Sequence, residues 1–273
     1  MIKVLLSGCG RMGGRITALS TLTEDIRIVG GLDRPEHPLM GEDLGESFHV
    51  GNIGARMWPA KEIIGVISST SPDVLVDFTN AEASSSNVVK AAGEGVGIVM
   101  GTTGHDPKQM EAIRSAIEAG RVPAVIAPNM SAGINVLLEA CDLVARMLPG
   151  FDVEVFEIHH NQKVDAPSGT ALKLAGQVAE SLGRDPGSSL VTGRSGSGKR
   201  GDEEIGVASL RAGDIVGDHT VIFAGTGERL ELTHRTHSRD ALASGALAAI
   251  RFVSRASPGI HTMKDVLLAG AGV

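Results

Sequence analysis

The chain has 273 residues, of which 42% are hydrophobic and 21% charged, and its formal net charge is −7. This length is enough for one large domain or two ordinary ones, each with its own hydrophobic core. The negative charge and the absence of a long basic block argue against nucleic acid as a partner, because neutralising phosphates requires clustered Lys and Arg.

The two cysteines, Cys9 and Cys141, are far apart in the sequence and fit no zinc or redox spacing. This use of cysteine favours a reducing compartment. The first ten residues, MIKVLLSGCG, form too short an apolar run for a signal peptide or a membrane span. We therefore expect a cytoplasmic protein with no membrane partner.

The first 130 residues alternate between apolar runs and helical spacing. Because the apolar runs are hydrophobic on both faces, the pattern predicts an α/β fold in which helices cover both sides of a parallel sheet. The predicted strands are 2–8, 26–34, 73–79, 97–104 and 122–129. The predicted helices between them are 15–23, 84–95 and 107–120.

In the second half of the chain, predicted strands and helices no longer alternate regularly. Three strand-like runs follow one another without long helices between them, which predicts an α+β domain with a mixed or antiparallel sheet. The stretch 183–204 is rich in Gly, Ser and charge and predicts a mobile loop. The predicted strands are 152–160, 204–213, 219–225 and 229–237, and the predicted helices are 134–148, 168–183 and, as the last element, 239–256.

A glycine motif follows the first predicted strand. Gly8, Gly10 and Gly13 form G-x-G-x-x-G between a strand and a helix, where glycines allow a tight turn and a pyrophosphate can bind at the helix N-terminus. Asp33 follows Gly13 by 20 residues, at the position expected for a carboxylate that binds the adenosine ribose. The neighbouring Arg34 could instead bind a 2′-phosphate, so NADH and NADPH both remain open. The predicted cofactor-binding residues here are Ser7, Gly8, Cys9, Gly10, Arg11, Met12, Gly13, Asp33 and Arg34.

Two later turns follow the fourth and fifth predicted strands. Such turns line the cofactor crevice at the carboxyl edge of a parallel sheet. An ordinary strand-to-helix turn with a Thr or Ser cap would account for each of them equally well. The predicted contacts to the nicotinamide half are Gly101, Thr102, Thr103, Ala127, Pro128, Asn129 and Met130.

A second glycine-rich run, GRSGSGK at 193–199, matches the first seven positions of a P-loop. The eighth residue is Arg200, where the motif needs Ser or Thr to reach magnesium. No strong strand precedes the run. We therefore expect no nucleoside triphosphate to bind there.

The run HHNQKVDAPSGTA at 159–171 places two imidazoles, an ammonium group and a helix start close together. Imidazole exchanges protons near neutral pH, and the backbone N–H groups of a helix start bind anions. Lys163 adds a positive charge. The run therefore predicts a site that binds a carboxylate and delivers a proton. Adjacent strand residues point to opposite faces, so His159 and His160 need not both reach it.

Metal binding is an alternative for this run, because His234 and His237 follow later in the chain. No carboxylate or cysteine completes a recognisable ligand spacing, so we expect no metal. Lys163 as a solvated side chain and Ser168 as a plain helix cap are the other ordinary explanations.

With its flanks, the run resembles the signature of the dihydrodipicolinate reductase family, E-[IV]-x-E-x-H-x-x-x-K-x-D-x-P-S-G-T-A. Every position from Glu154 to Ala171 matches. The resemblance spans the whole chain and continues in GRMG at 10–13, GTTG at 101–104, APNMSAGIN at 127–135, EIGVASLRAGDIVGDHTVIFAGTGERLELTH at 204–234 and MKDVL at 263–267. The chain departs from the family pattern at Ser7, where a glycine is usual, and at His261, where Tyr is common.

The resemblance implies an enzyme that reduces the cyclic imine dicarboxylate of diaminopimelate and lysine biosynthesis with NADH or NADPH. His159 matches the family's proton donor, and Lys163 matches its second catalytic residue and contacts the substrate. The other implied substrate contacts are His160, Ser168, Gly169 and Thr170. The resemblance also implies a Rossmann-type dinucleotide-binding domain at 1–130 and 240–273, a substrate-binding and oligomerisation domain at 131–239, and a homotetramer.

Two alternatives use the same residues. A dehydrogenase of this architecture could act on another small acid, such as a semialdehyde. A non-catalytic dinucleotide sensor would keep Gly8–Gly13 and Asp33 but would need no proton donor. The intact His159 and Lys163 argue against the sensor, and the paired anion sites favour a dicarboxylate.

Overall fold

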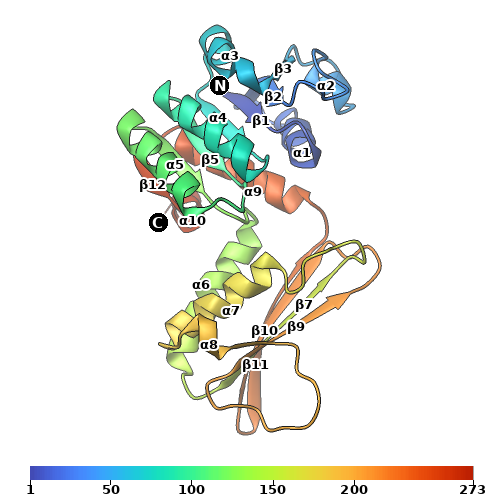
Figure 1. The fold of residues 1–273 in the computed structure, drawn as a ribbon, viewed down its shortest axis with the longest axis vertical. Helices are drawn as coiled ribbons and strands as arrows, with labels where there is room; N and C mark the ends of the chain where they lie inside the picture. Colours follow the sequence, from blue (N-terminus) through green and yellow to red (C-terminus); the bar gives the residue numbers. More distant parts are fainter. Residues whose placement is uncertain (273) are drawn as a thin grey trace. The chain divides into compact units, whose positions relative to one another are not determined.

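The computed structural model describes residues 1–272, which divide into two compact units. Unit 1 comprises Met1–Ala132 together with the segment from Asp240 onward, and unit 2 comprises Gly133–Arg239. Each unit has its own sheet (Figure 1). Each also has its own buried core. No helix in the described part of the chain is long and apolar enough to cross a membrane.

Unit 1 contains a seven-stranded parallel sheet in the order β12-β6-β5-β4-β1-β2-β3. The predicted parallel α/β architecture is confirmed. Its strands are β1 (Ile2–Ser7), β2 (Ile26–Asp33), β3 (Met57–Pro59), β4 (Val74–Asp77), β5 (Gly97–Met100), β6 (Pro123–Ile126) and β12 (Gly259–His261). Its helices are α1 (Arg11–Ser20), α2 (Leu44–Ser47), α3 (Ile63–Thr70), α4 (Ala81–Gly93), α5 (Pro107–Gly120), α9 (Asp240–Val253) and α10 (Met263–Ala271), with a 3-10 turn at Ala60–Glu62.

Two hydrophobic cores lie on opposite faces of this sheet, because successive strand residues point to opposite sides. Val4 and Leu6 of β1 pack on the face covered by α1, α9 and α10, whereas Leu5 packs on the face covered by α3, α4 and α5. The strands β2 and β3 lie on one side of β1, and β4, β5 and β6 lie on the other, so the strand order switches between β1 and β4. Ligands bind at such a switch point in open α/β sheets.

Unit 2 contains a mixed five-stranded sheet in the order β11-β10-β7-β9-β8. The predicted α+β character is confirmed. Helices α6 and α7 pack on one face, against the inward side chains of β7, β9 and β10. The strands are β7 (Asp152–His159), β8 (Leu190–Thr192), β9 (Ile205–Arg211), β10 (Gly217–Gly225) and β11 (Glu228–Thr236). The helices are α6 (Ala132–Met147), α7 (Gly169–Ser181) and α8 (Pro186–Ser189).

The structure differs from the prediction in several short elements. The strands β3 and β12, at the two edges of the parallel sheet, were not predicted. Each has only three residues, which is too short for an apolar run to mark it. The helix at 239–256 is not the last element, because α10 follows it. The stretch 183–204 is not loop throughout, since α8 and β8 lie within it. Arg200 ties its far end to Asp152 with an Nη1–Oδ1 distance of 2.9 Å.

Candidate active site

The turn between β1 and α1 is a cradle of backbone atoms. Gly8 has a φ of +97°, and a Cβ there would lie 2.3 Å from the carbonyl oxygen of Phe78. A Cβ on Gly13 would lie 2.4 Å from the carbonyl oxygen of Gly8. The backbone packs so closely here that neither position has room for a side chain. Such a close approach of the helix start to the turn is what dinucleotide binding requires.

The carboxylate of Asp33 lies at the end of β2 and closes this turn. Its Oδ2 accepts a hydrogen bond of 2.8 Å from the Cys9 N–H, and its Oδ1 accepts one of 2.8 Å from the Arg34 N–H. Gly10 caps α1 without any side-chain hydrogen bond, so the N–H groups of the first helical turn remain available to an anion.

A cavity of about 520 Å³ opens beside this turn. Four of the residues predicted to bind the cofactor line it, namely Gly8, Gly10, Asp33 and Arg34. It is also lined by residues that the sequence analysis did not single out, chiefly His37, Phe78, Thr79 and Asn80. A missing Cβ at each close approach, an uncapped helix N-terminus and a fixed carboxylate together fit a dinucleotide.

Three other predicted residues of the turn differ in exposure. Cys9 is buried, and burial together with the charge of Asp33 raises the pKa of its thiol to about 12. Met12 packs against the core of unit 1, whereas Arg11 is exposed. Of the three side chains, only that of Arg11 is well placed to meet a phosphate.

Ser7, which departs from the family pattern, belongs to a buried hydrogen-bond network. Its Oγ donates to Asp77 at 2.6 Å and accepts from the Asn87 amide at 3.0 Å. Thr102 Oγ1 donates to Asp77 at 2.5 Å and accepts from the Thr79 N–H at 2.8 Å. One buried carboxylate therefore links the carboxyl ends of β1, β4 and β5, and the hydroxyl group of Ser7 is engaged within this network.

The remaining residues predicted to contact the cofactor follow β5 and β6. A Cβ on Gly101 would lie 2.1 Å from the Phe78 ring, so this glycine is required by packing. Met130 is fully buried in the unit 1 core, so only its backbone can approach a ligand. Thr103 and Pro128 are exposed, Asn129 is half-buried and Ala127 is buried.

The other departure from the family pattern, His261, is accommodated locally. Its ring packs edge to face on Phe252 with the centroids 5.1 Å apart. Its Nε2 donates to the Ser257 carbonyl oxygen at 2.9 Å.

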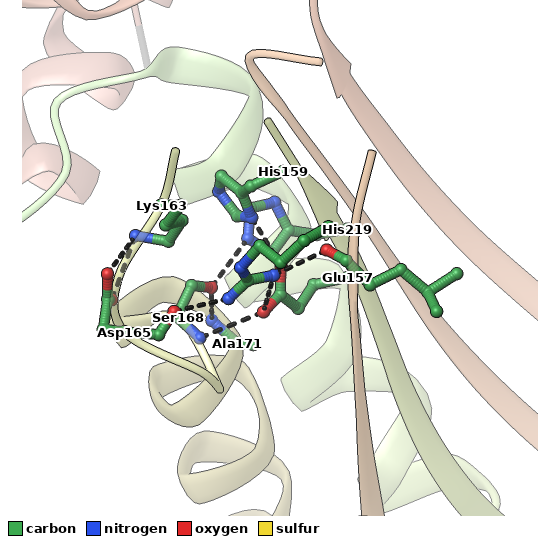
Figure 2. A network of polar contacts seen from close by, with 9 residues as sticks. Glu157, His159, Lys163, Asp165, Ser168, Ala171 and His219 are labelled. Atoms are coloured by element: carbon green, nitrogen blue, oxygen red, sulfur yellow. Dashed lines mark hydrogen bonds and ion pairs between the residues drawn. The ribbon is translucent and has the colours of Figure 1, made fainter. Parts of the chain in front are cut away.

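In unit 2 the end of β7 presents Glu157 and His159 on the same face, two residues apart. Glu157 is fully buried and contacts Nδ1 of His159. Arg211 of β9 donates from Nη1 to both oxygens of Glu157 at 3.0 Å. Figure 2 shows Glu157, His159, Ser168 and His219 converging on one another beside the start of α7.

The N-terminus of α7 borders the same group. Ser168 is its N-cap: its Oγ accepts the Ala171 N–H at 3.1 Å, and its own N–H donates to Glu157 Oε1 at 3.2 Å. The peptide bond Ala166–Pro167 just before it is cis. Gly169 and Thr170 form the first helical positions, as predicted, so the positive end of the helix dipole lies beside the histidines.

Lys163 lies in the loop between β7 and α7. Its Nζ donates to both oxygens of Asp165, at 2.7 and 3.0 Å, and its side chain is 21% exposed. His160 lies just past the end of β7, half-buried, and its carbonyl oxygen accepts the Lys163 N–H at 3.1 Å. The predicted cluster thus gathers within one unit, with Lys163 already paired to a carboxylate that the sequence analysis had not considered.

The charges around His159 act in opposite directions. Burial lowers its pKa, the contact with Glu157 raises it, and the nearby Lys163 and Arg211 lower it, so the pKa lies below the usual value for histidine. His219 of β10 packs edge to face on His159 with the centroids 5.2 Å apart. Burial and the neighbouring His159 hold the pKa of His219 at about 4, so this second imidazole is neutral near pH 7.

Sequence reasoning missed Arg211, His219 and Gly217, which come from β9 and β10. His219 Nε2 lies 3.3 Å from Ser168 Oγ. A Cβ on Gly217 would lie 2.9 Å from Nε2 of His159, so glycine at this position leaves room for the imidazole. All three lie within the stretch 204–234 that shares the family resemblance, but that resemblance gave them no role. The strand pairing brings them to β7.

Models of known protein families match both units. The family model described as dihydrodipicolinate reductase, N-terminus, matches residues 2–130, and the one described as dihydrodipicolinate reductase, C-terminus, matches residues 133–267. Together they cover nearly the whole chain.

Two relatives with the same protein name cover nearly the whole chain. The 4-hydroxy-tetrahydrodipicolinate reductase of Methanothermobacter thermautotrophicus is 46% identical over 270 residues, covering 98% of this chain and 99% of the relative. That of Methanocaldococcus jannaschii is 46% identical over 269 residues, covering 98% and 97%.

Among solved structures, the dipicolinate-bound dihydrodipicolinate reductase from Paenisporosarcina sp. TG-14 superposes with a TM-score of 0.77 at 24% identity, covering 96% of this chain and 97% of that one. An amine dehydrogenase from Mycobacterium smegmatis superposes with a TM-score of 0.63 at 15% identity, covering 96% and 95%. At these identities, both structures support the fold alone.

Proposed function

This chain belongs to the dihydrodipicolinate reductase family, and we propose that it reduces 4-hydroxy-tetrahydrodipicolinate to tetrahydrodipicolinate with NADH or NADPH. The reaction belongs to diaminopimelate and lysine biosynthesis. The observation that carries the proposal is the contact between the imidazole of His159 and the buried carboxylate of Glu157, which also accepts the N–H of Ser168 at the start of α7.

The cofactor half of the reaction is assigned to unit 1. A bound nicotinamide dinucleotide would supply the hydride. Gly8, Gly10 and Gly13 would admit its pyrophosphate to the N-terminus of α1, and Asp33 would accept hydrogen bonds from the adenosine ribose. Arg34 lies at the same cavity and would pair with a 2′-phosphate, so the residues suit either dinucleotide.

The proton half is assigned to His159. Hydride addition to the conjugated C=C–C=N system of the substrate would leave negative charge delocalised toward nitrogen, and a nearby acid must then supply a proton. Because Glu157 contacts Nδ1, the proton would leave from Nε2 of His159. Because burial lowers the pKa of His219 to about 4, this imidazole is neutral near pH 7 and would not compete as the donor.

Two substrate carboxylates need two anion sites. Lys163 would bind one by exchanging its partner Asp165, which is 59% exposed, for the substrate. The backbone N–H groups at Gly169 and Thr170, together with Ser168, would bind the other at the helix start. His160 would add a polar contact at the end of β7.

The test is a coupled assay in which the preceding synthase makes the substrate from pyruvate and aspartate semialdehyde. Oxidation of NADH or NADPH that depends on the synthase is expected. His159→Gln should lower kcat by about 10² to 10⁴, the usual contribution of a positioned general acid, while substrate KM changes little. Lys163→Ala should raise substrate KM and also lower kcat.

His237→Gln, which changes an exposed histidine in unit 2, is the matched control and should keep full activity. Dinucleotide binding without any synthase-dependent oxidation would contradict the reductase proposal. Normal turnover by His159→Gln would contradict only the role of that residue.

We also propose that the protein works as a homotetramer in the cytoplasm, assembled through unit 2. The supporting feature is β11, an edge strand whose residues are largely exposed, including Leu230 at 40%. An edge strand of this kind offers unpaired backbone groups to another chain. Light scattering after size-exclusion chromatography should give four times the mass of the 28.2 kDa chain, and a monomer would contradict the proposal.

A further inference from the structure

Glu157 is a fully buried carboxylate whose hydrogen bonds reach three separate elements. It contacts His159 on its own strand, Arg211 on β9, and the backbone N–H of Ser168 at the start of α7. A buried charge persists only when it is paired and hydrogen-bonded, and all three contacts satisfy that requirement.

We propose that Glu157 is a positioning residue that fixes the imidazole of His159 with a proton on Nδ1, so that Nε2 faces the reacting substrate, and that holds the Ser168 turn in register with it. This inference rests on the proposed function, because it assigns how the proton donor of that reaction is oriented. Glu157 is not assigned any contact with the substrate.

Glu157 remains ionised in this setting. Burial alone would raise the pKa of its carboxyl group, but the hydrogen bonds from His159 and Arg211 outweigh burial and leave the pKa below the usual value. An ionised carboxylate accepts hydrogen bonds and donates none, so the shared proton belongs to Nδ1 of His159. The tautomer of the neutral imidazole is thereby determined.

Neighbouring groups restrict the ring further. His219 packs against it edge to face at 78°, and the backbone of Gly217 lies where a Cβ would come within 2.9 Å of Nε2. The charged or titratable groups around His159 are therefore Glu157 on β7, Arg211 on β9, His219 on β10 and Lys163 in the following loop. Of these four, only Glu157 favours the protonated form that a donor needs.

The test is Glu157→Gln, which keeps the shape of the side chain but removes its charge. We expect kcat to fall by about 10- to 100-fold, part of the 10² to 10⁴ that a positioned acid contributes, with dinucleotide KM unchanged. A proton donor works in its protonated form, so activity is lost as pH rises through the pKa of His159. Because the variant removes the group that raises this pKa, the basic limb of the kcat profile should move to lower pH. Glu157→Asp, which restores the charge, should move the limb back toward that of the wild type.

Glu154→Gln is the matched control. Glu154 lies on the opposite face of the same strand and pairs with Arg200, with an Oε1–Nε distance of 3.3 Å. The same change of charge there should leave kcat and the pH profile unchanged. A profile that moves equally in both variants would overturn the proposal, because the effect would then come from general electrostatics.

A second measurement needs no turnover. Nitrogen-15 NMR of histidine-labelled protein should show the Nδ1–H tautomer of His159 in the wild type and a loss of that preference in Glu157→Gln. If removal of the charge leaves Arg211 unpaired and the variant unfolds, the double variant Glu157→Gln with Arg211→Met removes both charges and should show the same tautomer change.

The outcomes separate the two proposals. If the wild type has no reductase activity but Glu157→Gln still loses the Nδ1–H preference of His159, the result would contradict the proposed function and support the positioning role. A wild type that turns over normally, with kcat, pH limb and tautomer unaltered in Glu157→Gln, would overturn the positioning role alone.

Discussion

The two candidate sites of this chain differ in the groups that form them. In unit 1 the cofactor cradle is chiefly backbone: Gly8 and Gly13 make close approaches where no Cβ fits, and α1 begins without a side-chain cap. In unit 2 the site is chiefly side chains, with Glu157, Arg211 and His159 in direct contact.

This difference predicts opposite sensitivities. A site made of backbone tolerates a change of functional groups but not an added carbon atom. A site made of side chains tolerates little loss of charge, because each buried group depends on its partner. Substitutions that add only a methyl group therefore distinguish the two sites better than substitutions that remove charge.

The largest effect is expected from Gly13→Ala. The new Cβ would lie 2.4 Å from the Gly8 carbonyl oxygen, so α1 must move away from the turn that receives the pyrophosphate. Strain of about 1–3 kcal/mol is typical of such overpacking. Expressed as binding, this corresponds to dinucleotide affinity that is about 10- to 100-fold weaker. Calorimetric titration with NADH measures it, and kcat at saturating cofactor should change far less.

Gly65→Ala in α3 makes the same chemical change where nothing lies within 4 Å of the new Cβ. It should bind dinucleotide normally and gain slightly in Tm, since Ala is the better helix former. Equal losses of affinity in both variants would show that the close approach at Gly13 is not what the cofactor site requires.

A smaller effect is expected from Gly217→Ala, which adds a methyl group beside His159 in the side-chain site. Its Cβ would lie 2.9 Å from Nε2 of His159, so the imidazole must tilt away from its position against Glu157. We expect kcat to fall by about tenfold, equivalent to about 1.4 kcal/mol, with unchanged dinucleotide affinity. Stopped-flow measurement of NADH oxidation in single turnovers separates this step from product release.

If Gly217→Ala instead weakens dinucleotide binding and leaves kcat intact, the assignment of the cofactor to unit 1 and of the proton donor to unit 2 is wrong. Gly150→Ala provides the comparison within unit 2, because no atom lies within 4 Å of its new Cβ. It should keep normal kcat.

Much of the fold could be predicted because long buried strands carry their own pattern. β1, β4 and β5 are largely apolar on both faces, and each is followed by a helix. The edge strands β3 and β12 could not be found, since three residues are too few to show a period. They are defined by their pairing with β2 and β6 instead.

The candidate site was predicted only as far as one continuous run of sequence extends. His159, Lys163 and Ser168 lie within ten residues of one another and share a family signature. Arg211 meets Glu157 across 54 residues, and His219 meets Ser168 across 51. Contacts at such separation depend on the strand order of unit 2, which the sequence pattern leaves open.

The smallest effect is expected from Asp33→Asn, which tests the one charged side chain fixed within the backbone-built site. Both of its oxygens accept backbone N–H groups, so the carboxylate is held in place whether or not a cofactor binds. Its charge repels a 2′-phosphate, whereas Arg34 attracts one. Removing the charge should therefore move the ratio of kcat/KM for NADPH over NADH upward, by about threefold to tenfold, or up to about 1.4 kcal/mol.

The matched control for this prediction is Asp73→Asn, because Asp73 also accepts a backbone N–H, from Lys3 at 2.7 Å, but precedes β4 at the opposite end of the strand from the site. It should leave the cofactor ratio unchanged. A ratio that stays constant in Asp33→Asn would mean that Arg34 alone sets the choice of dinucleotide, and a fall in kcat/KM for both cofactors alike would mean that Asp33 acts by closing the turn. Either result would mean that the charge of Asp33 does not select between the two dinucleotides.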